Sequence, residues 1–350
     1  MTIFSNPEFD NHETVLFFKD PKTGLKAIIA IHDTTLGPAL GGTRMWNYGS
    51  EEEALTDVLR LSRGMTYKSS LTGLNLGGGK SVIIGDAKTQ KSPELFRAFG
   101  EAVGRLNGNY IAAEDVGTSV EDLEYARQST SYIAGISEGG AGDPSPATSW
   151  GVFNGLKAAA KYGLNATDLK GVRVAVQGLG HVGYGLCKHL REAGAELIVT
   201  DIYDQMVQKA VAEFDAKAVK PEEIIQQDVD IFAPCALGAV LNDETIPELK
   251  AKIIAGAANN QLAEDRHGQI LRDKGILYAP DYVINAGGII LISHEGPTFN
   301  RDKAMKQVAE IHDTLLNIFT RADRENRPTH EIAYQMARER IENTRLKMAS

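Results

Sequence analysis

The stretch GLNLGGGKSVIIGD, residues 73–86, places Lys80 directly after three glycines and before a short β-branched run. It fails the P-loop motif, because Leu74 occupies the position of that motif's first glycine and because a strand, not a helix, follows. Binding of a nucleoside triphosphate is therefore excluded here. Two interpretations remain. Lys80 either lies at a strand start where the glycines leave room for a small ligand against the backbone, or it is a surface lysine after a glycine-rich turn.

The stretch VRVAVQGLGHVGYGLCKHLREAGAELIVTD, residues 172–201, has the order strand, turn, helix, strand and acid that is typical of dinucleotide binding. Glycines at this spacing permit a tight turn, close approach of a pyrophosphate and close packing of the helix, whose free amides face the anion. Asp201 lies 23 residues after the first glycine, where a carboxylate accepts ribose hydroxyls. It repels a 2′-phosphate, and the following Ile202 supplies no cation, so NAD is favoured over NADP. The predicted loop comprises Gly178, Leu179, Gly180, His181, Val182 and Gly183.

Around this unit, helical and strand-like runs alternate as in a doubly wound parallel sheet. A helix is expected over 151–162 and strands within DVDIFAPCA, KIIAGAANN and GILYAPDYVINAGG. Residues 302–322 and 329–347 have a helical period, and we expect two closing helices that pack back across the domains.

The first part of the chain predicts a smaller α/β unit. A hairpin is expected over 14–33, a helix over 51–71 with a capping-box spacing from Ser50 to Glu53, and then a strand after Lys80, a helix near 92–106 and a strand at 109–113. The Gly-, Pro- and Ser-rich stretch 137–149 indicates a hinge or a cleft lining.

The predicted fold is therefore α/β with two domains and a cleft between them. Residues 1–136 would form an N-terminal substrate-binding and oligomerisation domain, and residues 145–325 a Rossmann-type NAD domain. The C-terminal helix, 329–350, is expected to pack back on the first domain.

Bulk composition narrows the class of protein. The net charge is −9 over 350 residues, which argues against a nucleic-acid or anionic membrane partner. Two cysteines, no signal-peptide pattern and no apolar run long enough for a bilayer predict a reduced, cytoplasmic protein. The eight histidines lack zinc-ligand spacing, so no metal site is expected.

A nicotinamide enzyme also needs a substrate site, and the first 135 residues offer Lys68 in GMTYKSS, Lys80, and Asp115 in AAEDVGT. Singly, each is more simply explained as a solvated charge. Together with IHDTTLGPALGGTRMW, DPSPATSWGV, VQGLGHVG, APCALGAVLNDETIP and IAGAANNQL, however, these motifs follow one another as in a known family. From about residue 12 to 345 the chain resembles the glutamate, leucine, phenylalanine and valine dehydrogenases, and most of all the leucine-type members.

That resemblance implies the reversible oxidative deamination of an L-amino acid with NAD. Lys68 would hold the substrate α-carboxylate together with backbone amides near Gly42. Lys80 would be the base that activates water, aided by a neighbouring cation such as Lys68 and by partial burial, and the glycines would let substrate crowd against it. Asp115 would exchange protons with the amino group.

The resemblance also supplies residues around the two ligands. The side-chain pocket would comprise Leu40, Ala113, Ile289 and Ile292. Positions near nicotinamide, ribose or substrate would be Thr148, Asn259, Asn260 and Asn285, and the loop passing the cofactor would contain Cys235 and Ala236.

An apolar pocket disfavours glutamate and favours a branched aliphatic substrate, leucine before isoleucine or valine. Phenylalanine, valine and tryptophan dehydrogenases of the family remain alternatives, and in another class stands a non-catalytic NAD-binding sensor. The segment IILISHEGPTFNRD differs from the family pattern expected beside the pocket. A homo-oligomer built from dimers is expected, with an octamer as one form.

Overall fold

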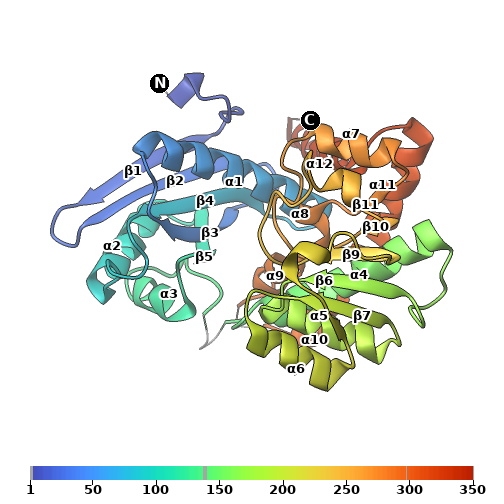
Figure 1. Ribbon diagram of the computed structural model, residues 1–350. Helices are drawn as coiled ribbons and strands as arrows, with labels where there is room; N and C mark the ends of the chain where they lie inside the picture. The colour runs from blue at the N-terminus through green and yellow to red at the C-terminus, as the bar shows by residue number, and fades with distance from the viewer. Residues whose placement is uncertain (1–2, 137–139, 297, 350) are drawn as a thin grey trace. The chain divides into compact units, whose positions relative to one another are not determined.

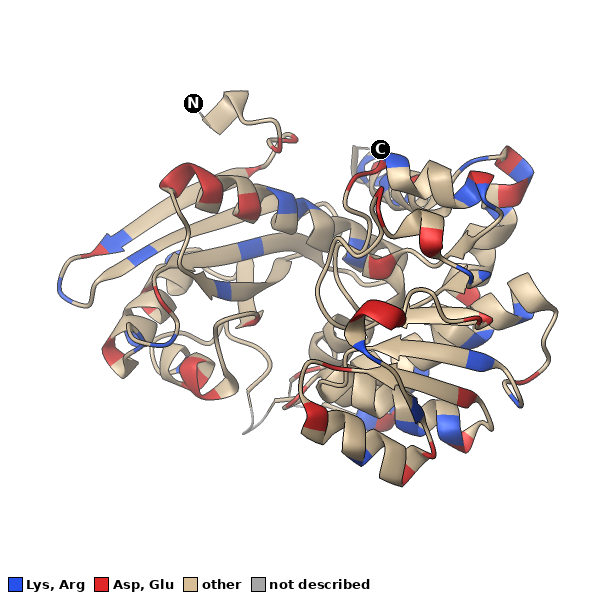
Figure 2. Cartoon of the chain, viewed as in Figure 1, with Lys and Arg blue, Asp and Glu red and all other residues tan. Residues whose placement is uncertain are grey.

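The computed structural model describes residues 3–136, 140–296 and 298–349, and these form two compact units (Figure 1). Unit 1 comprises Met1–Asp143, Ile292–Phe299 and Ala337–Ser350, and unit 2 comprises Pro144–Leu291 and Asn300–Met336. Acidic and basic residues are interspersed over each unit (Figure 2). Within the described residues, every helix is too short or too polar to cross a bilayer.

Unit 1 is built on a five-stranded mixed sheet of order β1-β2-β4-β3-β5. The strands are β1 (Thr14–Asp20), β2 (Leu25–Asp33), β3 (Ala39–Trp46), β4 (Gly77–Ile84) and β5 (Tyr110–Glu114). β1 and β2 form the predicted antiparallel hairpin, and β3 runs parallel to both β4 and β5. Helix α1 (Glu51–Leu71) covers one face, whereas α2 (Pro93–Gly104) and α3 (Val120–Arg127) cover the other (Figure 1).

Helix α1 begins as predicted, with one change at its cap. The Ser50 hydroxyl accepts the Glu53 N–H at 3.1 Å, but the Glu53 carboxylate accepts from Gly49 instead of Ser50. Three glutamates occupy its first turn and Lys68 its last, which suits the helix dipole.

Unit 2 contains a six-stranded parallel sheet of order β11-β10-β9-β6-β7-β8, which confirms the doubly wound prediction. The strands are β6 (Arg173–Gln177), β7 (Glu196–Thr200), β8 (Lys217–Ala218), β9 (Ile231–Pro234), β10 (Ile253–Ile254) and β11 (Leu277–Tyr278). After Pro144 the chain forms, in order, the helices α4 (Ser145–Leu164), α5 (His181–Glu192), α6 (Asp204–Phe214), α7 (Arg266–Asp273), α8 (Asp281–Ile284) and α9 (Gly287–Ser293).

Two helix predictions need correction. The helix expected over 151–162 begins at Ser145, because Pro146 lies in the first turn, where no intrahelical N–H is required. It absorbs the end of the predicted hinge 137–149, of which residues 137–139 lie outside the described residues. The helix expected over 302–322 is two helices, α10 (Arg301–Ala309) and α11 (Ile311–Glu325), which meet at Glu310. The last helix is α12 (Thr329–Ala349).

Candidate active site

Lys80 lies in the middle of β4 rather than at a strand start, since the strand already begins at Gly77. The three glycines do not leave room for a ligand, which corrects the sequence-based expectation. A Cβ at Gly78 would lie 2.1 Å from the Thr66 amide nitrogen, so α1 crosses the strand at this point. A Cβ at Gly79 would lie 2.6 Å from the Tyr110 ring. The glycines therefore admit neighbouring protein, and this close packing fixes the strand that carries Lys80.

The sheet register gathers the predicted substrate residues of unit 1 on one face. Lys80 shares the face of its neighbour Val82, which packs against α1. Leu40 and Gly42 pair with Ile111 and Ala113 across β3 and β5, and Leu40 and Ala113 are buried. Because side chains two residues apart share a face, Lys80, Leu40, Gly42 and Ala113 face the α1 side.

Lys80 and Asp115 form a close ion pair, with Nζ and Oδ2 2.6 Å apart. The Lys80 side chain is 6% exposed and that of Asp115 is 20% exposed. A Cβ at Gly42 would lie 2.7 Å from the Asp115 Cβ and 3.2 Å from Lys80 Nζ, so only glycine fits above the pair. Lys80 is thus paired with an anion, the Asp115 carboxylate. Lys68 lies half-buried in the last turn of α1.

Burial alone would raise the pKa of Asp115, but the charges of Lys80 and Arg44 outweigh it and lower that pKa to about 2. Thr118 also fixes the turn that presents this carboxylate. Its hydroxyl accepts the Asp115 N–H at 3.1 Å and donates to the Thr43 carbonyl at 2.9 Å. Asp115 is therefore ionised and oriented before any ligand arrives.

Arg44 was missed by the sequence reasoning, although it lies two residues after Gly42 in the quoted motif GGTRMW. Its Nε lies 3.2 Å from Asp115 Oδ2, and its Nη1 lies 3.0 Å from Asp57 Oδ2. The only sequence signal was its place on the face of Gly42, which becomes visible once the strand is known.

The pocket residues from the atypical segment 289–302 fall in both units. Ile289 is buried in unit 2, and Ile292 is half-buried in unit 1, 3.7 Å from where a Cβ on Gly135 would lie. Within the same segment, the Glu295 carboxylate accepts the N–H groups of Gly135 at 2.9 Å and Ala141 at 2.6 Å. Burial raises the pKa of Glu295. This carboxylate ties the segment to Gly135 and Ala141.

The glycine loop of unit 2 has the geometry that the motif predicts. Gly178 has φ +97°, and a Cβ there would lie 2.8 Å from the Ala236 Cβ. A Cβ on Gly183 would lie 2.0 Å from the Gly178 carbonyl oxygen, so close helix packing requires glycine. Around Gly180, by contrast, a Cβ would meet nothing within 4 Å, and no side chain caps the start of α5 there. The first amides of α5 are therefore open to an anion.

Asp201 follows β7 and lies against the loop. Its carboxylate accepts the Leu179 N–H at 2.5 Å and the Tyr203 N–H at 2.9 Å. A pocket of about 360 Å³ is lined in part by Asp201, Val219 and Lys220. Lys220 was missed as a neighbour of Asp201, because it follows a different strand, β8.

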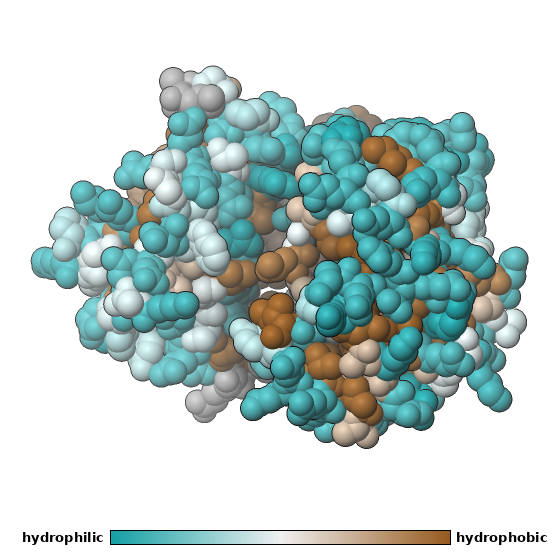
Figure 3. Space-filling model, in the orientation of Figure 1, coloured by the Kyte–Doolittle hydropathy of each residue, from teal (hydrophilic) through white to brown (hydrophobic). Residues whose placement is uncertain are grey.

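Further predicted cofactor residues follow strands that end at the same edge. Cys235 and Ala236 follow β9, and the Cys235 N–H donates to Gln177 at 2.7 Å. Burial raises the pKa of the Cys235 thiol to about 12. Exposed apolar side chains, Ile202 and Leu237, also follow β7 and β9, and Figure 3 shows hydrophobic surface over unit 2 on the face that it draws.

The asparagines near the end of the sheet supply polar groups. Asn285 Nδ2 donates to Asn259 Oδ1 at 2.6 Å and to the Ala257 carbonyl at 3.1 Å. Asn285 Oδ1 is buried without a hydrogen-bond partner in the described part of the chain, so it can accept from a ligand. Asn259 and Asn260 are exposed, and the Thr148 hydroxyl donates to the Pro144 carbonyl at 3.1 Å. Open amides, an unpaired acceptor and a ribose-type carboxylate together fit a dinucleotide.

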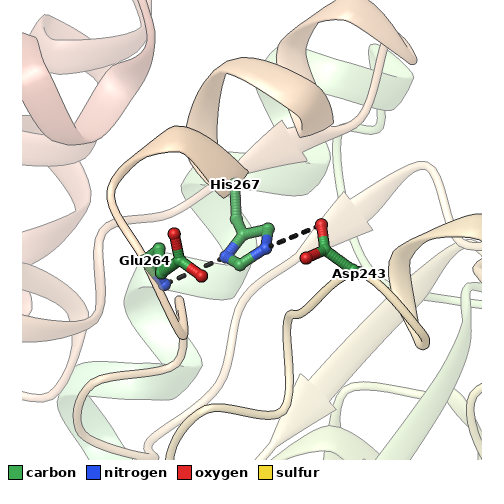
Figure 4. A group of neighbouring side chains, drawn as sticks. All are labelled: Asp243, Glu264 and His267. Carbon is green, nitrogen blue, oxygen red and sulfur yellow. Dashed lines mark hydrogen bonds and ion pairs between the residues drawn. The ribbon is translucent and has the colours of Figure 1, made fainter.

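A separate cluster of Asp243, Glu264 and His267 could by composition hold a metal (Figure 4). His267 Nδ1 accepts the Glu264 N–H at 2.9 Å, and Nε2 lies 3.3 Å from Asp243 Oδ1. Arg266 pairs with both carboxylates, at 2.5 Å to Asp243 and 2.9 Å to Glu264. The Arg266 guanidinium already pairs with both carboxylates, and both ring nitrogens of His267 already have partners. The cluster is therefore a structural ion-pair network.

Comparison with known proteins agrees with this geometry. Residues 12–132 match the family model described as the Glu/Leu/Phe/Val dehydrogenase dimerisation domain, and residues 139–209 and 200–347 match that of glutamate/leucine/phenylalanine/valine dehydrogenase. The chain is 58% identical over 347 residues to the leucine dehydrogenase of Geobacillus stearothermophilus, covering 99% of this chain and 95% of the relative. The leucine dehydrogenase of Bacillus subtilis is 55% identical over 347 residues, with the same coverage.

Solved structures share the fold. The L-tryptophan dehydrogenase of Nostoc punctiforme has a TM-score of 0.84 and 48% identity, covering 96% of this chain and 97% of that one. A hetero-hexameric glutamate dehydrogenase of Thermus thermophilus has a TM-score of 0.78 at 22% identity, covering 96% of this chain and 90% of that one, which indicates the fold alone. On the two family models and the full-length identities, this chain belongs to the glutamate, leucine, phenylalanine and valine dehydrogenase family.

Proposed function

We propose that this protein catalyses the reversible NAD-dependent oxidative deamination of a branched-chain L-amino acid, with leucine preferred, to the 2-oxo acid, ammonium and NADH. The observation that carries the proposal is the Lys80–Asp115 pair, whose charged atoms lie 2.6 Å apart beside Gly42. Full-length relatives that are leucine dehydrogenases support the substrate class.

In this mechanism the ammonium–carboxylate pair moves protons. Asp115 accepts a proton from the substrate amino group, which frees the nitrogen lone pair that must form the iminium. Lys80, after releasing its own proton to solvent, takes a proton from water as the water oxygen attacks the iminium carbon, which gives a carbinolamine. Asp115 then returns its proton to the nitrogen. As the C–N bond breaks and the carbonyl forms, the carbinolamine hydroxyl loses its proton to solvent, and the released ammonia takes one up to become ammonium. Lys68 holds the α-carboxylate throughout, so it orients the α-carbon without changing charge.

The dinucleotide is proposed to bind at the carboxyl ends of the unit 2 strands. When bound, NAD supplies the acceptor for the hydride that leaves the substrate α-carbon. The open amides at the start of α5 would hold the pyrophosphate, and Asp201 the ribose hydroxyls. Asn285, with its unpaired Oδ1, would orient the nicotinamide end together with Thr148. Because Asp201 repels a 2′-phosphate, NAD is preferred over NADP.

The substrate side chain is proposed to contact Leu40, Ala113, Ile289 and Ile292. All four are apolar, so a second carboxylate would be left unpaired and glutamate would be a poor substrate. We also propose a homo-oligomer built from dimers, which the match of residues 12–132 to a dimerisation domain supports. Light scattering of the purified protein would test it, and a monomer would contradict it.

One assay separates this proposal from its alternatives. The absorbance at 340 nm is followed with NAD or NADP and a panel of leucine, isoleucine, valine, phenylalanine, tryptophan and glutamate. We expect the three branched aliphatic substrates to exceed the others in kcat/KM, with NAD as cofactor. Higher values for phenylalanine or tryptophan would favour those dehydrogenases of the family. No NADH with any amino acid, combined with measurable NAD binding, would favour a non-catalytic sensor.

A further inference from the structure

Arg44 lies beside the acid–base pair but belongs to none of the roles assigned so far. It is on β3, on the same face as Gly42 and Lys80, and its side chain is 21% exposed. Its Nε lies 3.2 Å from Asp115 Oδ2, the same oxygen that lies 2.6 Å from Lys80 Nζ. Both cations, Lys80 and Arg44, therefore contact the same oxygen of Asp115.

The other end of the Arg44 guanidinium is fixed by a second carboxylate. Nη1 contacts Asp57 Oδ1 at 3.3 Å and Oδ2 at 3.0 Å, and Asp57 comes from α1. The Tyr48 hydroxyl donates to the same Asp57 Oδ2 at 2.7 Å. Donors and acceptors thus alternate from Tyr48 through Asp57, Arg44 and Asp115 to Lys80.

The two cations on Asp115 differ in one property that matters for the reaction. A lysine can act as a base only after losing its proton, and it then no longer balances the carboxylate. A guanidinium remains charged at every working pH and presents a planar, rigid fork. Arg44 therefore keeps Asp115 paired and oriented during the step in which Lys80 is neutral.

We propose that Arg44, held by Asp57 and Tyr48, is a positioning residue that orients Asp115 and favours its ionised form, whether Lys80 is charged or neutral, until Asp115 accepts the substrate proton; this inference rests on the proposed function. Arg44 acts through Asp115 and is assigned no contact with substrate. Asp57 fixes the far end of the guanidinium, because without its carboxylate Arg44 Nη1 would lose both of these contacts.

The test uses Arg44→Gln, Arg44→Lys and Asp57→Asn in the full-length protein, with Arg63→Gln as a matched control. Arg63 lies on α1 in unit 1 and pairs with Glu8 at 2.7 Å, with the two side chains 28% and 27% exposed. It thus tests the loss of a partly exposed arginine ion pair that does not involve Asp115. kcat and KM for leucine with NAD are measured across pH after thermal unfolding has established that each variant is folded.

We expect Arg44→Gln to lower kcat about 100-fold, as a misplaced catalytic group does, with KM for leucine little changed. The pH at which kcat falls on the acid side of its profile, the acid limb, should rise by about 1–3 pH units, because a cation beside the Asp115 carboxylate is lost. Arg44→Lys should keep the acid limb of the unmodified enzyme and retain more kcat. Asp57→Asn should lose less kcat than Arg44→Gln and should leave the acid limb in place.

A kcat and pH profile in Arg44→Gln equal to those of Arg63→Gln would overturn the inference. If Arg44→Gln does not fold, the same comparison is made with Asp57→Asn, and unmodified kcat in that variant would overturn it. A double-mutant cycle between Arg44→Lys and Asp115→Asn in thermal unfolding needs no activity. Coupling in that cycle, with no turnover of any amino acid, would refute the proposed function alone. Turnover that does not change when Arg44 is substituted would refute this inference alone.

Discussion

The two units prepare for their ligands in opposite ways. In unit 1 the groups proposed to react are side chains that already pair with one another, since Lys80 and Arg44 both contact the Asp115 carboxylate. In unit 2 the groups proposed to meet the pyrophosphate and the nicotinamide are left open, as shown by the uncapped start of α5 and by Asn285 Oδ1. Proton transfer needs groups whose charge is set in advance, whereas an anionic cofactor needs donors that nothing else occupies. Substitutions in unit 1 should therefore affect turnover, and those in unit 2 should affect cofactor affinity and choice.

The largest effect is expected for Lys80→Ala. General-base catalysis typically contributes 10²–10⁴-fold, so kcat for leucine oxidation should fall by about that factor. Steady-state kinetics at 340 nm measures it. Lys68→Ala is the comparison, because a residue that holds the carboxylate in all states should change mainly KM. A pure KM effect in Lys80→Ala and a pure kcat effect in Lys68→Ala would require the two roles to be exchanged.

The next effect concerns cofactor choice in unit 2. Asp201→Ser combined with Ile202→Arg removes the carboxylate and adds a cation, while Lys220 remains in the same pocket. A hydrogen bond to a charged group is worth about 1.5–3 kcal/mol, so the preference for NAD over NADP should narrow roughly 10–100-fold. The ratio of kcat/KM for the two cofactors measures this change. Equal use of both cofactors by the unmodified enzyme would refute the role of Asp201.

A smaller effect is expected in the substrate pocket. Ala113 is 5% exposed and pairs with Gly42, so Ala113→Gly would open space beside the acid–base pair. A methylene-sized change in an apolar pocket is worth about 1–3 kcal/mol, and the kcat/KM ratio of phenylalanine to leucine should rise about tenfold or more. Leu40→Val, a change of similar size on the same face, is the control. It measures how much the ratio changes when the pocket is enlarged at another position. An unchanged ratio in Ala113→Gly would remove this residue from the pocket.

The smallest effect concerns stability at Glu295. Glu295→Ala would leave the N–H groups of Gly135 and Ala141 without their acceptor and should lower the free energy of unfolding by about 1–3 kcal/mol. Glu295→Gln keeps an acceptor oxygen and should cost less. Denaturant unfolding at several pH values measures both.

The pH dependence of that variant has a definite sign. Because burial raises the pKa of Glu295 in the folded protein, this group contributes stability below its unfolded pKa and loses it as pH rises through the folded pKa. Glu295→Gln should remove that dependence in the range just above the ordinary glutamate pKa. Identical pH dependence in Glu295→Gln and the unmodified protein would contradict the assignment.

Local patterns in the sequence predicted the elements and the loop. Turn residues located the β1–β2 hairpin, Ser50 located the start of α1, and the spacing from Gly178 to Asp201 located the dinucleotide unit, because each signal lies within one short stretch. The family prediction was confirmed by both family models. The break at Glu310 was missed because no glycine or proline marks it.

Long-range contacts could not be predicted in the same way. Arg44 meets Asp115 across 71 residues, and Glu295 meets Gly135 across 160 residues, so neither pairing leaves a local pattern. The glycines before Lys80 show a related limit. A missing side chain predicts that something approaches closely, but the sequence does not say whether it is a ligand or, as here, α1 and the Tyr110 ring.

The division of labour between the two units is tested most directly by one binding measurement. The dissociation constant for NAD is determined by isothermal titration calorimetry for the unmodified protein and for the double variant Lys80→Ala, Asp115→Asn, in the absence of amino acid. We predict equal dissociation constants although the variant has lost turnover. Weakened NAD binding in a variant that remains folded would contradict the assignment of chemistry to unit 1 and cofactor binding to unit 2.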